Sequence, residues 1–356
     1  MSRRALTLLL AGLLTLLLGT VGAWLPVPYV VLSPGPTENT LGEVQGRPVI
    51  RIEGHETYPT SGGLNLVTVA YQGGPGGGIN LLTALRGWVD PTTAVVPQET
   101  IFPANDSVQE VEERNSREMT NSQQLATAAA LRELNIPVRT VIAVQGTQKG
   151  SPAHGRLQVG DEIVSVDGRT VSTTDEIAAA VQRHQPGERV RFVVERKGKR
   201  VTVDLETVAA GNGRVQVGVL MAPQFKFPFT VDITVGDVGG PSAGLMFALG
   251  IYDKLTPGSL TGGLTIAGTG TIDEHGRVGP IGGIQQKMVG ARRSGATIFL
   301  TPAENCAEAV KAVPNGLRLV KVETLRGALD ALEALTSGDR RAADRVPACS
   351  SASAAD

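Results

Sequence analysis

The sequence around position 242 reads Gly236-Asp237-Val238-Gly239-Gly240-Pro241-Ser242-Ala243-Gly244-Leu245. Glycines on both sides of one serine allow the backbone to turn sharply. The residues from 243 to 249 are largely apolar and predict the first turns of a buried helix. Ser242 would then lie at a helix N-terminus, where unpaired N–H groups and the helix dipole favour an oxyanion or a phosphate. Ser242 is therefore the candidate nucleophile, and Gly240 and Ala243 are candidate supporting residues.

A serine hydroxyl is inert at neutral pH unless a base takes its proton. The candidate base is Lys287, 45 residues further on, within Gly279-Pro280-Ile281-Gly282-Gly283-Ile284-Gln285-Gln286-Lys287-Met288-Val289. This stretch predicts a glycine turn that leads into a second amphipathic helix with few charges. Apolar surroundings lower the pKa of a lysine and let it act as a base. The spacing alone does not show that the two residues meet.

Two motifs in this order are similar to those of a known family. Gly240-Pro241-Ser242-Ala243-Gly244, followed by Pro280-Ile281-Gly282-Gly283 and Lys287, resembles the proteolytic domain of Lon-type serine–lysine endopeptidases. The similarity extends roughly over residues 225–335. It implies an α/β proteolytic domain at 211–335 with a serine–lysine dyad.

The resemblance also implies a supporting role for Thr269, because the segment Thr269-Gly270 matches the one whose threonine lies beside the dyad. The sequence departs from the family at Gly239, where aspartate is usual, and Asp237 comes two residues earlier. That departure leaves any acidic helper unassigned, although it does not affect the dyad.

Other interpretations of the same residues remain open. Ser242 could be a helix N-cap and Lys287 a surface lysine, since both are common. The glycine-rich turn could also cradle a phosphate, as in small-molecule kinases of a related fold. His275 lies in a polar turn, which is typical of a surface histidine rather than of a catalytic triad.

The N-terminus carries an uncharged, leucine-rich stretch over residues 5–25. It is long enough to cross a bilayer. Arg3 and Arg4 precede it and the first acidic residue, Glu38, follows it, so the charge bias keeps the N-terminus cytoplasmic and exports the rest. We therefore expect residues 1–25 to be a single-pass anchor in the cell membrane. The alternative is a signal peptide cleaved near residues 21–23, although the apolar run exceeds a typical signal core.

Residues 26–137 carry no recognisable chemical motif, and we expect them to form an extracytoplasmic region of their own. Short strands are predicted at 48–52 and 64–70. The glycine run at 73–78 predicts a flexible loop, because no Gly-Lys-Ser/Thr follows it. A helix is predicted over 119–134.

Residues 138–208 alternate short β patterns with one helix near 174–183. Gly150-Ser151-Pro152-Ala153, Leu157-Gln158-Val159-Gly160-Asp161-Glu162-Ile163 and Val166-Asp167-Gly168 resemble a PDZ domain of the kind attached to envelope proteases. The resemblance implies a mainly-β domain that adds an extended peptide as an extra strand. A spacer that binds nothing is the alternative.

Composition excludes several classes of function. The net charge is −1, so no global field attracts nucleic acid. Cys306, Cys349 and four scattered histidines offer no metal-ligand spacing, so we expect neither a metal nor another cofactor. The two cysteines could form a disulfide or remain free thiols. Residues 336–356 are polar and predicted to be disordered.

These features together predict a multidomain protein: an N-terminal transmembrane helix, a mainly-β PDZ domain and an α/β Lon-type proteolytic domain. No Walker motif occurs in the sequence. The resemblance therefore implies an ATP-independent, envelope-anchored serine endopeptidase that acts on proteins or peptides. It also implies self-association, because Lon-type domains tend to assemble in rings. The alternative function is a catalytically dormant PDZ adaptor.

Overall fold

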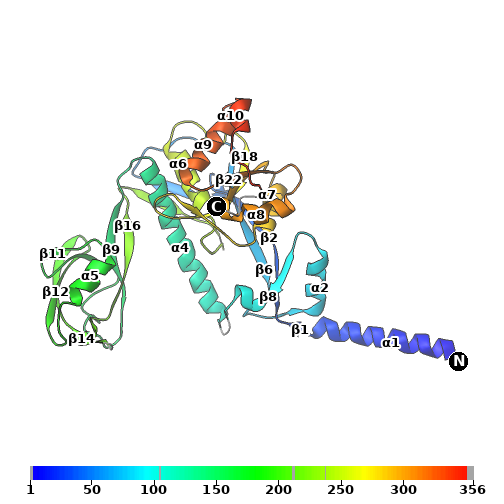
Figure 1. Ribbon diagram of the computed structural model, residues 1–356, viewed down its shortest axis with the longest axis horizontal. Coiled ribbons are helices and arrows are strands. Elements are labelled where there is room, and N and C mark those ends of the chain that lie inside the picture. Colours follow the sequence, from blue (N-terminus) through cyan, green and yellow to red (C-terminus); the bar gives the residue numbers. More distant parts are fainter. Residues whose placement is uncertain (1–2, 104–105, 211–212, 237, 351–356) are drawn as a thin grey trace. The chain divides into compact units, whose positions relative to one another are not determined.

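The computed structural model describes residues 3–103, 106–210, 213–236 and 238–350, and Figure 1 traces its helices and strands. The chain divides into two compact units. The first unit combines Met1–Ile136 with Phe229–Asp356, and the second unit is Pro137–Pro228. The second unit is therefore inserted into the sequence of the first. This arrangement corrects the predicted order of separate domains in tandem.

The first unit is built on a mixed sheet with strand order β22-β21-β18-β6-β2-β8. β22, β21, β18 and β6 are parallel neighbours, whereas β2 pairs antiparallel with β6 and β8. β6, β2 and β8 all come from the predicted separate region at 26–137. The sequence did not reveal this because a strand pattern does not specify its distant partner. The strands are β2 (Tyr29–Asn39), β6 (Gly63–Gln72), β8 (Ala94–Pro97), β18 (Thr265–Gly268), β21 (Ile298–Pro302) and β22 (Arg318–Val322).

Shorter strands pair outside this sheet. β17 pairs antiparallel with β5 and leads into the serine turn. β19 and β20 pair antiparallel on either side of the polar turn that contains His275. The short strands are β1 (Pro26–Val27), β3 (Glu43–Val44), β4 (Arg47–Pro48), β5 (Ile50–Glu53), β7 (Ile79–Asn80), β17 (Thr230–Ile233), β19 (Thr271–Ile272) and β20 (Val278–Gly279).

Helices pack on the sheet and on one another. α4 starts with a capping box between Ser107 and Glu110 and packs against α6, while α7 packs against β2 and β6. The predicted helix at 119–134 is the second half of α4. Its first half is rich in charges and lacks an apolar stripe that would reveal it. The helices are α2 (Leu81–Val89), α3 (Gln98–Ile101), α4 (Val108–Glu133), α6 (Gly244–Leu255), α7 (Ile284–Arg293), α8 (Cys306–Ala309), α9 (Leu325–Thr336) and α10 (Arg340–Asp344).

The second unit has a sheet with strand order β13-β12-β10-β9-β16, to which β11 adds beside β10. Its core buries Ile142, Ile177 and Phe192. The mainly-β prediction is confirmed, but the boundary at 208 is too early, because β16 pairs along β9. The elements are β9 (Arg139–Thr147), β10 (Glu162–Val166), β11 (Arg169–Thr170), α5 (Thr174–Val181), β12 (Arg189–Arg196), β13 (Lys199–Glu206), β14 (Val208–Ala209), β15 (Val215–Gln216) and β16 (Val219–Lys226).

The C-terminal segment is ordered up to residue 350, which corrects the predicted disorder from 336. It contains α10, and its residue Ala348 forms a β-bridge with Val320. A disulfide joins Cys306 to Cys349, with the sulfurs 2.01 Å apart. The two cysteines are therefore paired rather than free. The polar composition predicted disorder because composition alone does not show that a disulfide holds this segment to the rest of the unit. Residues 351–356 lie outside the described residues.

α1 (Arg3–Trp24) is long and apolar enough to cross a membrane, judged by length and composition. A helix near the N-terminus meets the same test when it is a signal sequence. At its end, Leu25 leads into β1, which pairs with β7. α1 is thus tied by its C-terminal end to the start of α2.

Replacing residues 137–228 by a short glycine–serine linker should leave the first unit folded, because Arg139 pairs directly with Lys226 and brings the two ends of the insert together. An isolated fragment 211–335 should fail to fold, because it lacks β6 and α4. Circular dichroism and thermal unfolding in detergent measure whether the linker variant and the isolated fragment are folded. A cooperative transition in the isolated fragment would contradict a shared core.

Candidate active site

Ser242 lies in the turn between β17 and α6. The turn depends on Gly240, whose φ of +84° is strained for any other residue. α6 starts after its N-cap residue, Ala243, which makes no side-chain capping bond. Ser242 is therefore not the N-cap, and its hydroxyl makes no hydrogen bond among the described residues. Asp237, the acidic residue two positions before Gly239, lies outside the described residues.

α4 holds this turn from the other side. The backbone N–H of Gly240 donates to the carbonyl of Asn115 at 3.1 Å. The Ser122 hydroxyl donates to the carbonyl of Pro241 at 3.0 Å. A Cβ at Gly239 would come within 2.8 Å of the Asn115 Cβ, a distance that real structures essentially never show. The glycine that replaces the usual aspartate is thus required by the closeness of α4.

The N–H groups around Ser242 differ in availability. That of Gly240 is used by Asn115, so Gly240 contributes its conformation rather than a free donor. The N–H groups of Ser242 and Ala243 have no acceptor within the described part of the chain. They lie just before the first turn of α6, where the helix dipole favours negative charge. A developing oxyanion could accept hydrogen bonds from these two groups.

Lys287 lies in the first turn of α7 and is only 3% exposed. Burial lowers the pKa of its ammonium group to about 7 from the ordinary 10.5, since desolvation disfavours the charged form. Its turn depends on Gly283, where φ is +67° and a Cβ would lie 2.6 Å from Cγ2 of Val69. β6 thus approaches α7 closely and closes the apolar wall around the amine.

Thr269 connects the two candidate catalytic residues. The Lys287 Nζ donates to the Thr269 Oγ1 at 3.2 Å, and that hydroxyl donates to the backbone carbonyl of Ser242 at 3.0 Å. The N–H of Gly270 donates to the same carbonyl at 2.9 Å. Thr269 follows the buried strand β18 and is 0% exposed. The structure therefore brings Ser242, Lys287 and Thr269 together from three elements.

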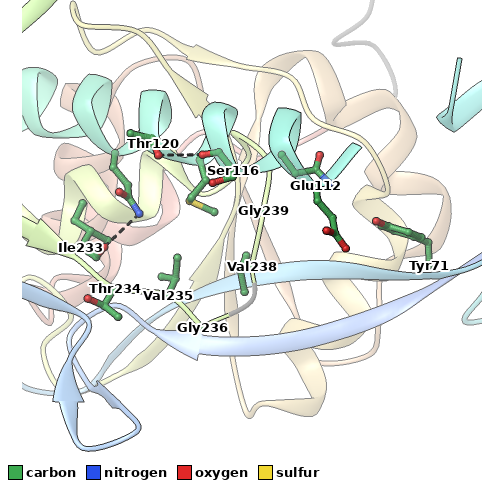
Figure 2. Close-up of a pocket in the computed structure, with 13 residues that line it drawn as sticks. Tyr71, Glu112, Ser116, Thr120, Ile233, Thr234, Val235, Gly236, Val238 and Gly239 are labelled. Carbon is green, nitrogen blue, oxygen red and sulfur yellow. Dashed lines mark hydrogen bonds between the residues drawn. The ribbon is translucent and has the colours of Figure 1, made fainter. Parts of the chain in front are cut away.

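Ser242 and Lys287 line one cavity of about 440 Å³. A second cavity, of about 780 Å³, lies between α4 and residues 233–236 and 238–239. Figure 2 shows Glu112, Ser116 and Thr120 of α4 on one side of it and Thr234, Val235 and Gly236 on the other. The two cavities share four lining residues, Tyr71, Asn115, Val238 and Gly239, so they adjoin. Together they form a groove that leads to the serine.

Sequence reasoning missed the residues that β6 and α4 contribute to this groove. Tyr71 and Asn115 have no motif of their own, because their role depends on the pairing of β6 with β18 and on the packing of α4. His275, by contrast, is 74% exposed beside Glu274, as expected of a surface histidine.

Two family models match the chain. Residues 107–207 match a PDZ domain, and residues 231–334 match the Lon protease (S16) C-terminal proteolytic domain. The first match begins in α4 and ends before β16, whereas the second unit in the structure runs from 137 to 228. The second match contains the turn of Ser242 and the helix of Lys287.

The chain is similar in part to larger proteins. It is 26% identical over 235 residues to Lon protease 2 of Bacillus subtilis (strain 168), which is 61% of this chain and 42% of that protein. It is 42% identical over 79 residues to Lon protease 2 of Herpetosiphon aurantiacus, 22% of this chain and 9% of that protein. The chain thus spans less than half the length of these relatives.

One solved structure similar to part of the chain is the PDZ domain of the SdrC-like protein Lmo2051 from Listeria monocytogenes. It covers 23% of this chain and 86% of its own, with 21% sequence identity and a TM-score of 0.22. This similarity is too low to support an argument about function.

The reactivity of Ser242 toward a phosphonylating probe should rise as pH increases through about 7. Below the pKa of Lys287 its ammonium group cannot accept a proton, and above that pKa the neutral amine can. Labelling rates between pH 5 and 9 measure this. A Lys287→Met variant should stay unreactive throughout, and a flat profile in the parent would contradict the assigned base.

Replacing Thr269 by valine should lower the labelling rate by about 100-fold, because small misplacements of reacting groups have effects of this size. The profile should also move to lower pH, since the ammonium group loses its hydrogen-bond acceptor. Thr269→Ser keeps the hydroxyl and is the matched control. An unchanged profile in Thr269→Val would show that the threonine does not act on the lysine.

Proposed function

We propose that this chain, which combines a PDZ domain with a Lon-type proteolytic domain, is an ATP-independent serine endopeptidase anchored in the cell membrane. The observation that carries the proposal is the chain of hydrogen bonds from the buried amine of Lys287 through Thr269 to the backbone of Ser242. A buried lysine with a pKa of about 7 lines the same cavity as Ser242, whose hydroxyl has no hydrogen-bond partner among the described residues, and this is the arrangement that a serine nucleophile needs.

The reaction follows from the positions of these groups. Neutral Lys287 takes the proton of Ser242, and the serine oxygen attacks the carbonyl carbon of a peptide bond. The N–H groups of Ser242 and Ala243 donate to the oxyanion that forms, and each such donor contributes about 3 kcal/mol to the stability of a transition state. The Lys287 ammonium then gives its proton to the leaving amine. Water hydrolyses the acyl-enzyme, with Lys287 again acting as base.

The hydrogen bond between the Lys287 amine and the Ser242 hydroxyl must form when substrate binds. The Lys287 Nζ donates to Thr269, and no hydrogen bond joins it to Ser242 in the described residues. Catalytic hydrogen bonds are often long or misaligned without substrate and tighten in the complex. This same geometry is what would be expected of a dormant peptidase fold, so the PDZ adaptor remains the second candidate function.

The substrates we propose are extended or unfolded segments of proteins. The groove beside Ser242 is open to an extended chain and lies between backbone segments. No Walker motif occurs within these 356 residues, so the chain carries no recognisable ATPase of its own that could unfold a substrate. The match to the Lon proteolytic domain favours this chemistry over phosphate transfer at the same turn.

The second unit supplies a separate peptide site in this proposal. β16 lies at one edge of its sheet, and within the described residues no further strand pairs with its outer side. α5 packs beside β16. Pro223 within β16 is typical of an edge strand, because proline has no backbone N–H and is tolerated where that side of the strand lacks a ladder partner. An extended peptide end can therefore add along β16, as PDZ domains bind their ligands.

Membrane anchoring completes the proposal. α1 is retained as a span, with Arg3 and Arg4 on the cytoplasmic side and both compact units outside. The disulfide between Cys306 and Cys349 supports an oxidising compartment. A processed signal sequence would release the same two units in soluble form.

Full-length protein in detergent should cleave an unfolded protein substrate without ATP. Ser242→Ala and Lys287→Ala should each lower the turnover by about 10⁴-fold or more, because the loss of one member of a catalytic unit costs about as much activity as the loss of all its members. Lys199→Ala, at an exposed position in β13, is the matched control and should keep full activity. Circular dichroism must first establish that all variants fold. Equal cleavage by all four proteins, or none by any, would favour the PDZ adaptor.

A further inference from the structure

α2 presents an apolar face that the rest of the protein does not cover. Its inner side packs on the sheet, where a Cβ at Gly87 would lie 2.7 Å from Cγ2 of Val95. Its outer side exposes Leu82 and Leu85, together with Trp88 at 55% and Val89 at 84% exposure. A helix on the surface of a soluble domain normally carries polar residues there. A contiguous apolar face of this kind indicates a partner.

The place of α2 in the fold identifies that partner. The N–H of Leu81 donates to the carbonyl of Leu25, the first residue after α1, at 3.2 Å. Directly beside this bond, β1 pairs with β7, with Pro26 opposite Asn80 and Val27 opposite Ile79. Figure 1 shows α2 next to the inner end of α1. α2 therefore starts where the apolar helix ends.

From these contacts we propose that α2 is a membrane-interface helix whose outer face inserts into the lipid headgroup boundary beside the point where α1 leaves the bilayer. The inference rests on the proposed anchoring by α1. It goes beyond the proposed peptidase activity because it assigns a second, separate contact with lipid.

The length and composition of α2 fit this position. Nine residues give a helix about 14 Å long, too short to cross a bilayer, so its apolar face can be buried only at the boundary. Tryptophan is enriched at this depth because its ring is amphipathic, and the face contains Trp88 while α1 ends in Trp24. Arg86, exposed on the same helix, can reach lipid phosphate while its stem contacts the apolar layer.

The helix cannot turn its apolar face inward. Asn80 caps its start by accepting a hydrogen bond from the N–H of Thr83 at 2.8 Å. The Trp88 ring meets the edge of Tyr29, with ring centres 5.8 Å apart. α2 also packs against β2 and β8 of the central sheet. The exposed face is thus fixed by the fold, and it holds an edge of the catalytic sheet at the membrane surface.

A sole-tryptophan experiment tests the inference, because the sequence contains only two tryptophans. Trp24→Phe leaves Trp88 as the only one, and Trp88→Phe leaves Trp24 as the matched reporter of the anchor. Each full-length protein is reconstituted into phosphatidylcholine vesicles with bromines at defined depths on the acyl chains. We expect blue-shifted Trp88 emission that is quenched most by the shallowest bromines.

The outcomes separate this inference from the proposed anchoring. Quenching of Trp24 without quenching of Trp88 would overturn the role of α2 and leave the anchor intact. Loss of quenching at both positions would overturn both. Blue-shifted but unquenched Trp88 would mean that protein, such as a second copy of the chain, covers the helix, which also overturns the inference.

A second variant tests whether the exposed leucines carry the contact. Leu82→Gln with Leu85→Gln, added to Trp24→Phe, should reduce the quenching of Trp88 severalfold. The same pair added to Trp88→Phe should leave the quenching of Trp24 unchanged. Because both side chains are exposed, the substitutions should leave the fold intact, as circular dichroism will show. Unchanged Trp88 quenching would contradict docking through this face.

Discussion

The burial of the Lys287 amine is the constraint on which the candidate active site depends. Desolvation is what lowers its pKa, and no ion pair with a carboxylate is found for it in the described residues. An uncharged amine near neutral pH therefore requires a wall that excludes water. The close packing of α7 on β6 contributes to that wall, and this close approach requires glycine at position 283.

The candidate site as a whole is built from segments on both sides of the inserted unit. β6 and α4 precede the insert, whereas the serine turn, β18 and α7 follow it. The catalytic unit thus closes only when distant parts of the sequence pair with each other. The insert is compatible with this closure because its first and last strands, β9 and β16, are antiparallel neighbours and return the chain to where it left.

The insertion of the second unit into the sequence of the first has a consequence for chain connectivity. β16, whose outer edge has no strand partner in the described residues, is followed within a few residues by β17, which leads to the turn of Ser242. The strand to which we propose that a peptide adds and the strand that leads into the turn of Ser242, the candidate nucleophile, are therefore nearly continuous in sequence. Domains that are joined only by a long flexible linker lack so short a connection between two strands.

The sequence by itself indicated Ser242 and Lys287 as candidates, along with the apolar N-terminal helix, because glycine turns and apolar runs are local signals. Thr269 became a candidate only through the resemblance to Lon-type proteolytic domains. It also gave the two domain types through their motifs. Only the tertiary structure decided that residues 26–136 belong to the catalytic unit, and that Asn115 and Ser122 support the serine turn. The reason is that hydrogen bonds and strand pairs between residues far apart in the chain are set by the packing of the whole sheet, which no local pattern encodes.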